Sequence, residues 1–143
     1  MLSVGNLVDL KGHDLVIGAM THFPECELLI VGEGEQRQSL QALASGLGVG
    51  NRVRFLGAVS QTELVEIYSA SEVLVLASSR EGMPNVVLEA MACDTPVVAT
   101  KVGGIPEVVC SPEAGVLVKE RNVDSIVAGI TKLLTAYPDP GAT

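Results

Sequence analysis

The sequence predicts a doubly wound α/β domain, in which helices cover both faces of a parallel sheet of about six strands. The expected strands are short runs that are apolar on both faces, such as ELLIV at 27–31 and EVLVLA at 72–77. Most of them are followed by a segment with helical periodicity, and a parallel sheet covered on both faces has this pattern. The length of 143 residues corresponds to one such Rossmann-like domain.

The expected elements follow one another along the whole chain. Strands are predicted at 3–7, 27–31, 52–56, 72–77, 96–100 and 115–118. Helices are predicted at 14–23 and 36–47, then from Ser60 through Leu64, Ile67 and Tyr68, and finally at 85–92 and 122–136. The first helix should bury Leu15, Ala19 and Met20, and Ser60 with Glu63 forms a capping box at the start of the third. Residues 1–137 are expected to form the domain, with a loose tail at 138–143.

Composition excludes several classes of protein. Asp and Glu outnumber Lys and Arg by 17 to 9, so the net charge is −8, and the basic residues are scattered. A nucleic-acid partner is therefore not expected. Aromatic residues make up only 3%, which argues against stacking platforms for bases or sugars. The chain has no signal-peptide pattern and no apolar run of roughly 18 residues. Cys26, Cys93 and Cys110 are expected to be buried, reduced thiols of a cytoplasmic protein.

Ligands of doubly wound sheets bind beyond the carboxyl ends of the strands, so the loops at 7–13, 32–35, 57–60, 78–85 and 100–107 are the candidates. The GEGEQR segment at 32–37 partly matches a dinucleotide fingerprint. Arg37 stands where the third glycine would be, and two glutamates would repel a pyrophosphate. We expect a tight turn there. Among single residues near the loops, solvated roles are expected for His13 and Arg80, and Glu107 is expected to shape a loop.

The loop at 78–85 has the features of an anion site. It ends where a helix begins, so free backbone N–H groups would point out of the sheet. Glu81 and Glu89 flank this position, and carboxylates accept hydrogen bonds from vicinal hydroxyls. The pattern suits a sugar–phosphate–ribose ligand. The alternative is that Glu89 interacts with the helix dipole and Glu81 is a solvated loop residue.

The segment EGMPNVVLEAMACDTPVV at 81–98 resembles the donor-domain signature of the group 1 (family 4) glycosyltransferases, which have the GT-B architecture. Four further segments match in order: VGNLVDLKG at 4–12, LLIVGEG at 28–34, RVRFLG at 52–57 and GGIPE at 103–107. The resemblance implies the C-terminal half of a GT-B fold, which binds a nucleotide-activated sugar for retaining transfer of a hexosyl group.

The resemblance also implies residue roles. Glu81 would contact the hydroxyls of the donor sugar, Glu89 would bind the ribose, and Lys11 would neutralise the diphosphate. Glu81 and Lys11 are thus the expected catalytic residues. The full set expected to bind the donor is Asn6, Lys11, Phe55, Leu56, Gly57, Glu81, Gly82, Met83, Pro84, Asn85, Val86 and Glu89. No metal or other cofactor is expected, since no Asp-x-Asp motif is present and Lys11 with the helix terminus can stabilise the departing diphosphate.

The sequence departs from the family pattern at several points. Asn6 stands where family members commonly carry an arginine, and Asp94 replaces a usual glycine in a turn. An acceptor-binding N-terminal domain, expected to carry any peripheral membrane association, is not part of this sequence. We therefore expect a domain that is inactive alone. Two alternatives are a non-catalytic nucleotide-sugar-binding or interaction domain, and half of a GT-B sugar-nucleotide epimerase.

Overall fold

The computed structural model describes residues 1–81, 85–109 and 115–136, and it confirms the predicted architecture. A parallel sheet of six strands has the order β3-β2-β1-β4-β5-β6. The strands are β1 (Leu2–Val4), β2 (Leu28–Val31), β3 (Val53–Gly57), β4 (Leu74–Leu76), β5 (Val97–Thr100) and β6 (Gly115–Val118).

Helices connect the strands. The α-helices are α1 (His13–Ala19), α2 (Arg37–Gly46), α3 (Gln61–Ala70), α4 (Asn85–Ala92), α5 (Ile105–Val108) and α6 (Val123–Ala136). Three short 3₁₀ turns are η1 (Asp9–Lys11), η2 (Met20–His22) and η3 (Gly50–Arg52). Because each connection returns the chain to the same end of the sheet, all strand carboxyl ends lie at one edge.

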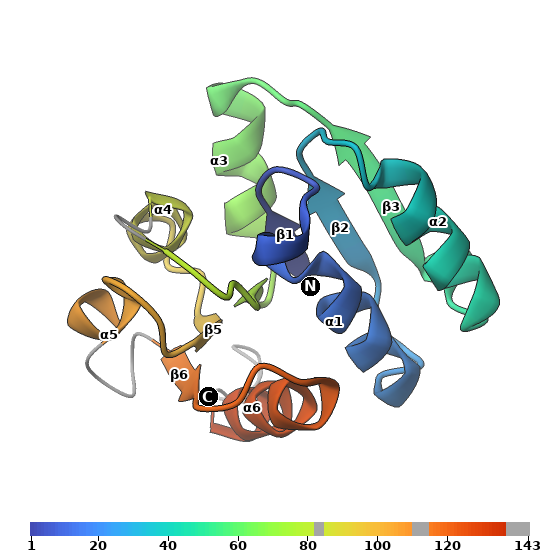
Figure 1. Cartoon of the computed structure of the whole chain (residues 1–143). Coiled ribbons are helices and arrows are strands. Elements are labelled where there is room, and N and C mark those ends of the chain that lie inside the picture. The colour runs from blue at the N-terminus through green and yellow to red at the C-terminus, as the bar shows by residue number, and fades with distance from the viewer. Residues whose placement is uncertain (82–84, 110–114, 137–143) are drawn as a thin grey trace.

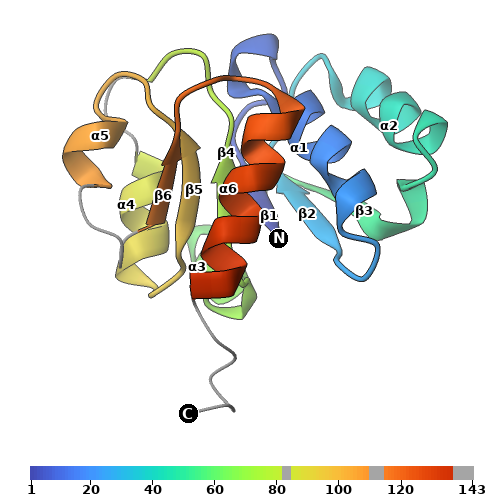
Figure 2. The same ribbon diagram turned by 90° about the horizontal axis from the view of Figure 1, so that it is seen from below.

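The helices form two layers. α1, α2 and α6 cover one face of the sheet, with Ile17, Ile30 and Ile130 in a shared core. α3, α4 and α5 cover the other face, where Tyr68 and Val87 are fully buried. In Figure 2, α6 crosses in front of the sheet and α3 lies behind it. The two cores contain aliphatic side chains almost entirely, as the small aromatic content requires.

Several predicted boundaries are wrong by a few residues. β1 ends at Val4 rather than at residue 7, because the chain turns at Gly5, whose φ is +146°. The predicted helix at 14–23 is α1 followed by η2, and Leu15 is only half-buried, while Val16 is fully buried. The four-residue helix α5 was not predicted, since one turn has too little periodicity to detect. Ser60 caps α3 as expected, its Oγ accepting from the Glu63 amide at 3.1 Å.

The order of the strands places a topological switch point between β1 and β4. The chain moves from β1 to β2 and β3 on one side, and then from β4 to β5 and β6 on the other. The loops that follow β1 and β4 consequently start side by side and leave in opposite directions. They are in contact, because the Ser79 amide donates to the Leu10 carbonyl at 2.9 Å. Ligands of doubly wound sheets bind at such a point.

Candidate functional site

Two charged residues from these loops face each other at the switch point. The Nζ atom of Lys11, after β1, lies 2.8 Å from Oε1 of Glu81, after β4. The Ser78 hydroxyl donates to the same carboxylate oxygen at 3.0 Å. The Glu81 side chain is only 8% exposed, so the alternative that it is a solvated loop residue is wrong. The Lys11 side chain is 23% exposed and carries N–H donors in addition to the one that bonds Glu81.

The backbone around this pair is tightly packed. Gly12 has φ +70°, and a Cβ there would lie 2.1 Å from the Ala77 carbonyl oxygen. Arg121, which precedes α6, donates from Nε to the same Ala77 oxygen at 2.8 Å and from Nη2 to the Asp9 carbonyl at 2.7 Å. Arg121 therefore joins the two loops from a third. Sequence reasoning missed it, because no motif surrounds it.

Gly103, after β5, completes the surroundings of Glu81. Its φ is +55°, and a Cβ there would lie 1.6 Å from the Glu81 carbonyl oxygen. Thr100, at the end of β5, donates from Oγ1 to the Ser78 carbonyl at 2.6 Å. The loop carrying Glu81 is thus held from the side of β5 as well as from the side of β1.

His13 is buried, contrary to the expected solvated role. It is 2% exposed, and its Nε2 lies 3.1 Å from the Asn6 carbonyl oxygen. Because that oxygen can only accept, Nε2 carries the proton and Nδ1 accepts from the Ser3 hydroxyl at 2.8 Å. Burial lowers the pKa of His13, against the opposing effect of the Asn6 carbonyl. The neutral ring spans the loop between β1 and Lys11.

We expect His13 to make the stability of the chain depend on pH. Below the ordinary histidine pKa of about 6.5, the unfolded chain binds a proton at this residue more readily than the folded chain does, so the free energy of unfolding falls with falling pH. Thermal unfolding between pH 7.5 and 5.5 measures this loss. His13→Asn should flatten the dependence, whereas His22→Asn, at an exposed histidine, should keep the wild-type slope. Parallel profiles for wild type and His13→Asn would exclude the effect.

Glu89 lies one turn into α4 and is held by two residues of α3. Gln61 Nε2 donates to Oε2 at 3.1 Å, and the Tyr68 hydroxyl reaches Oε1 at 3.3 Å. Glu89 is half-buried. Asn85, the first residue of α4, is exposed and Val86 is half-buried, while Gly82, Met83 and Pro84 lie outside the described residues.

The residues expected near a base lie two strands from β1. Phe55, Leu56 and Gly57 end β3, and Leu56 is exposed. The Arg37 guanidinium donates to the Phe55 carbonyl at 3.4 Å and pairs with Glu33 at 3.2 Å. The expected turn is present at 32–36, and Arg37 is the first residue of α2. A Cβ at Gly32 would lie 2.0 Å from the Gly5 carbonyl oxygen, so the turn after β2 packs against the loop after β1.

The remaining predicted residues have surface or turn positions. Asn6, Arg80 and Glu107 are exposed, and Glu107 lies in the first turn of α5. Asp94 has φ +58°, in agreement with its expected place in a turn. Cys26 and Cys93 are free but only half-buried, so the prediction of buried thiols was too strong for these two, and Cys110 lies outside the described residues.

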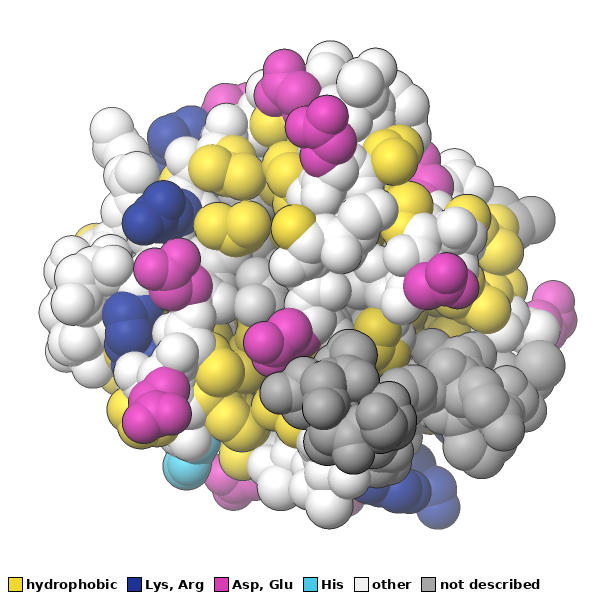
Figure 3. All heavy atoms as spheres, turned by 180° about the vertical axis from the view of Figure 1, so that it is seen from behind, with side chains coloured by type: hydrophobic (Ala, Val, Ile, Leu, Met, Phe, Trp, Pro, Cys, Tyr) yellow, Lys and Arg dark blue, Asp and Glu magenta, His cyan; other side chains and the backbone are white. Residues whose placement is uncertain are grey.

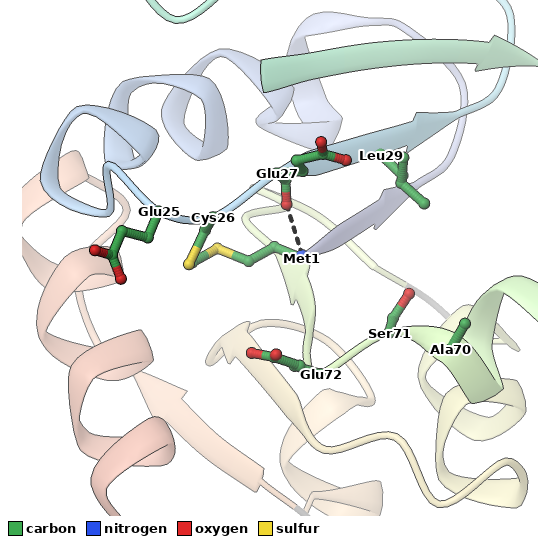
Figure 4. A pocket seen from close by; sticks show the side chains of 8 residues that line it. All are labelled: Met1, Glu25, Cys26, Glu27, Leu29, Ala70, Ser71 and Glu72. Carbon is green, nitrogen blue, oxygen red and sulfur yellow. Dashed lines mark hydrogen bonds between the residues drawn. The ribbon is translucent and has the colours of Figure 1, made fainter. Parts of the chain in front are cut away.

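A pocket of about 250 Å³ lies at the opposite end of the sheet, where the strands begin. Glu25, Glu27 and Glu72 are among the residues that line it, and the Met1 amino group donates to the Glu27 carbonyl at 2.8 Å (Figure 4). Figure 3 shows this end of the molecule, where acidic, basic and apolar side chains are interspersed.

Within the described ranges, no cluster of His, Cys, Asp and Glu could hold a metal ion, and no helix is long and apolar enough to cross a membrane.

Comparisons with known proteins agree on one family. The family model described as glycosyl transferases group 1 matches residues 1–140. An uncharacterised glycosyltransferase of Methanocaldococcus jannaschii is 38% identical in an alignment of length 140, which covers 96% of this chain and 36% of that protein. The D-inositol 3-phosphate glycosyltransferase of Mycobacteroides abscessus is 35% identical over 92% of this chain and 31% of its own length.

Solved structures support the same assignment. HepE of Anabaena, solved in complex with UDP-glucose, superposes with a TM-score of 0.86 at 28% identity. The match covers 94% of this chain and 39% of the HepE chain. This chain therefore spans between about 30% and 40% of the length of each of these three proteins.

Proposed function

The chain belongs to the group 1 glycosyltransferases, and we propose that it binds the nucleoside-diphosphate sugar that such an enzyme uses as its donor. The observation that carries this proposal is the placement of Lys11 and Glu81 at the switch point between β1 and β4. A cation beside a carboxylate suits a ligand that combines phosphates with hydroxyl groups. HepE, a structural neighbour solved with UDP-glucose, supports this choice of ligand.

The diphosphate would bind between Lys11 and the amino end of α4. The Lys11 ammonium group has three N–H donors, and Glu81 accepts one of them. The other donors, with the positive end of the α4 dipole, can neutralise phosphate oxygens. Asn6 supplies no charge, so diphosphate binding depends on Lys11 and the helix terminus more than it would with an arginine at this position.

The carboxylates of Glu81 and Glu89 would bind the hydroxyl groups of the donor's two sugars, the hexose and the ribose. We assign Glu81 to the hydroxyls of the transferred hexose, where a buried carboxylate also stabilises the positive charge that develops on the ring during transfer with retention. We assign Glu89 to the ribose hydroxyls. Asn85 and Val86 would face the sugar and phosphates, and Phe55, Leu56 and Gly57 would frame the base.

Transfer to an acceptor would need the part of the protein that its relatives have in addition. This chain spans 36% of the Methanocaldococcus relative and 31% of the Mycobacteroides one. Holding two reactants in register contributes on the order of 7–11 kcal/mol to catalysis, and residues 1–143 alone would lack that contribution. We expect donor binding without transfer. We place the protein in the cytoplasm, in keeping with its free thiols at Cys26 and Cys93.

Ligand-observed NMR tests the proposal on the 143-residue chain. UDP, GDP and ADP are titrated separately, without metal, at up to millimolar concentration. At least one of them should bind saturably, because the chain holds both the cation and the carboxylates of the site. Inorganic pyrophosphate should bind more weakly than that nucleotide, since it engages Lys11 and the amino end of α4 but has no ribose for Glu89. Absence of binding by all three nucleotides would contradict the proposal.

A further inference from the structure

Tyr68 presents its hydroxyl to Glu89 from a rigid position. Tyr68 belongs to α3, and its side chain is fully buried in the core that also contains Leu74 and Val87. Its backbone carbonyl accepts from the Thr95 hydroxyl at 2.6 Å. With both ring and backbone fixed, the one polar atom of the side chain reaches Glu89 Oε1 at 3.3 Å.

Gln61 holds the other oxygen of the same carboxylate. It lies in the first turn of α3, seven residues before Tyr68, which is close to two helical turns, so both side chains project from one face of the helix. Its Nε2 donates to Glu89 Oε2 at 3.1 Å. Two side chains of α3 thus donate to the two carboxylate oxygens of Glu89, which belongs to α4.

We propose that Tyr68 and Gln61 are positioning residues, which hold the Glu89 carboxylate in the orientation that accepts both hydroxyls of a ribose. This inference rests on the proposed function, in which Glu89 binds the nucleotide ribose. A carboxylate offers about four lone-pair positions. The two donors of α3 occupy one on each oxygen, and one on each oxygen remains for a vicinal diol.

The arrangement also makes binding less costly. A glutamate side chain loses considerable rotamer freedom when a ligand fixes it, and that cost falls when neighbours have already ordered it.

Burial, followed by the neighbouring charge of Glu89, raises the pKa of Tyr68. The hydroxyl therefore keeps its proton and remains a donor throughout the physiological range.

The test measures how well the chain distinguishes a nucleotide with the diol from one without it. Dissociation constants of the 143-residue chain are measured for UDP and 2′,3′-dideoxy-UDP, with the matching GDP and ADP pairs run in parallel. The variants are Tyr68→Phe, Gln61→Ala and Glu89→Ala. Thr95→Val is the matched control, because it removes a buried hydroxyl that bonds Tyr68 through the backbone and leaves the Tyr68 hydroxyl in place. Melting temperatures are recorded for every variant.

For the nucleotide that binds, the wild-type chain should prefer the diol form by about 10-fold, the ratio expected for hydrogen bonds to a charged group. Glu89→Ala should abolish this preference. Tyr68→Phe and Gln61→Ala should each reduce it by about 3-fold or more, with little change in affinity for the dideoxy form. Thr95→Val should lower the melting temperature and keep the full preference.

The contrary outcomes are distinct. If Tyr68→Phe and Gln61→Ala keep the wild-type preference while Glu89→Ala loses it, the ribose role of Glu89 stands and the positioning inference is wrong. If Thr95→Val reduces the preference as much as Tyr68→Phe does, Tyr68 acts through general packing and the inference is also wrong. If wild type and Glu89→Ala show the same preference, the ribose role fails and the inference fails with it. If none of the three nucleotides binds to wild type, donor binding itself is refuted.

Discussion

Lys11→Met is expected to weaken binding of a nucleoside diphosphate to this chain by about 100-fold, or on the order of 3 kcal/mol. Two effects add. The diphosphate loses its charged donor, and Glu81, 8% exposed, keeps a negative charge without its cation beside the phosphates. Isothermal titration with the nucleotide that binds measures the change, and a melting curve shows whether the variant is folded.

A double-mutant cycle separates the two effects. Glu81→Gln alone should leave nucleotide affinity unchanged or raise it, since Lys11 is no longer shared. Lys11→Met combined with Glu81→Gln should recover about 10-fold relative to Lys11→Met, because the unpaired carboxylate is gone. If the dissociation constant of Lys11→Met for the nucleoside diphosphate is within about 3-fold of the wild-type value, Lys11 does not contact the diphosphate.

Gly12→Ala is expected to lower the free energy of unfolding by more than about 3 kcal/mol, or the melting temperature by about 10 °C. An L-residue at φ +70° costs on the order of 1–2 kcal/mol. In addition, the new Cβ would lie 2.1 Å from the Ala77 carbonyl oxygen, a backbone atom. Arg121 donates to that oxygen and to the Asp9 carbonyl in the loop before Gly12, which opposes any shift that would relieve the clash.

Gly48→Ala is the matched control for this prediction. Gly48 has φ +77°, nearly that of Gly12, but nothing lies within 4 Å of the position that its Cβ would take. Its substitution should cost only the conformational part, about 1–2 kcal/mol. Thermal unfolding followed by circular dichroism compares the two variants. If both variants lose the same stability, the close approach of the loops after β1 and β4 does not require a glycine at position 12.

The overall fold could be predicted from the sequence because its signals are local. Apolar runs such as ELLIV mark strands that are covered on both faces, and Ser60 with Glu63 marks the start of α3. Boundaries were less accurate where one residue decides them, as Gly5 does for β1. The helix α5 was missed because a single turn shows no periodicity.

The site was predicted in part. Lys11 and Glu81 are 70 residues apart in the sequence, and the resemblance to a known family, together with the rule that ligands bind at strand carboxyl ends, assigned both to one site. Arg121, Ser78 and Tyr68 were missed, because their roles depend on tertiary contacts. His13 was misjudged for the same reason, since its partners Ser3 and Asn6 give no sequence signal.

Amide chemical-shift mapping of the ¹⁵N-labelled chain tests most directly whether the switch point is the nucleotide site. UDP, GDP and ADP are added in turn, and the shifts are assigned to residues. For the nucleotide that binds, the largest changes should fall at Gly12, Ser78, Ser79 and Val86, with no comparable change at Cys26 or Glu72. Changes concentrated around the pocket where the strands begin, or no change with any of the three at millimolar concentration, would contradict the assignment of the donor site.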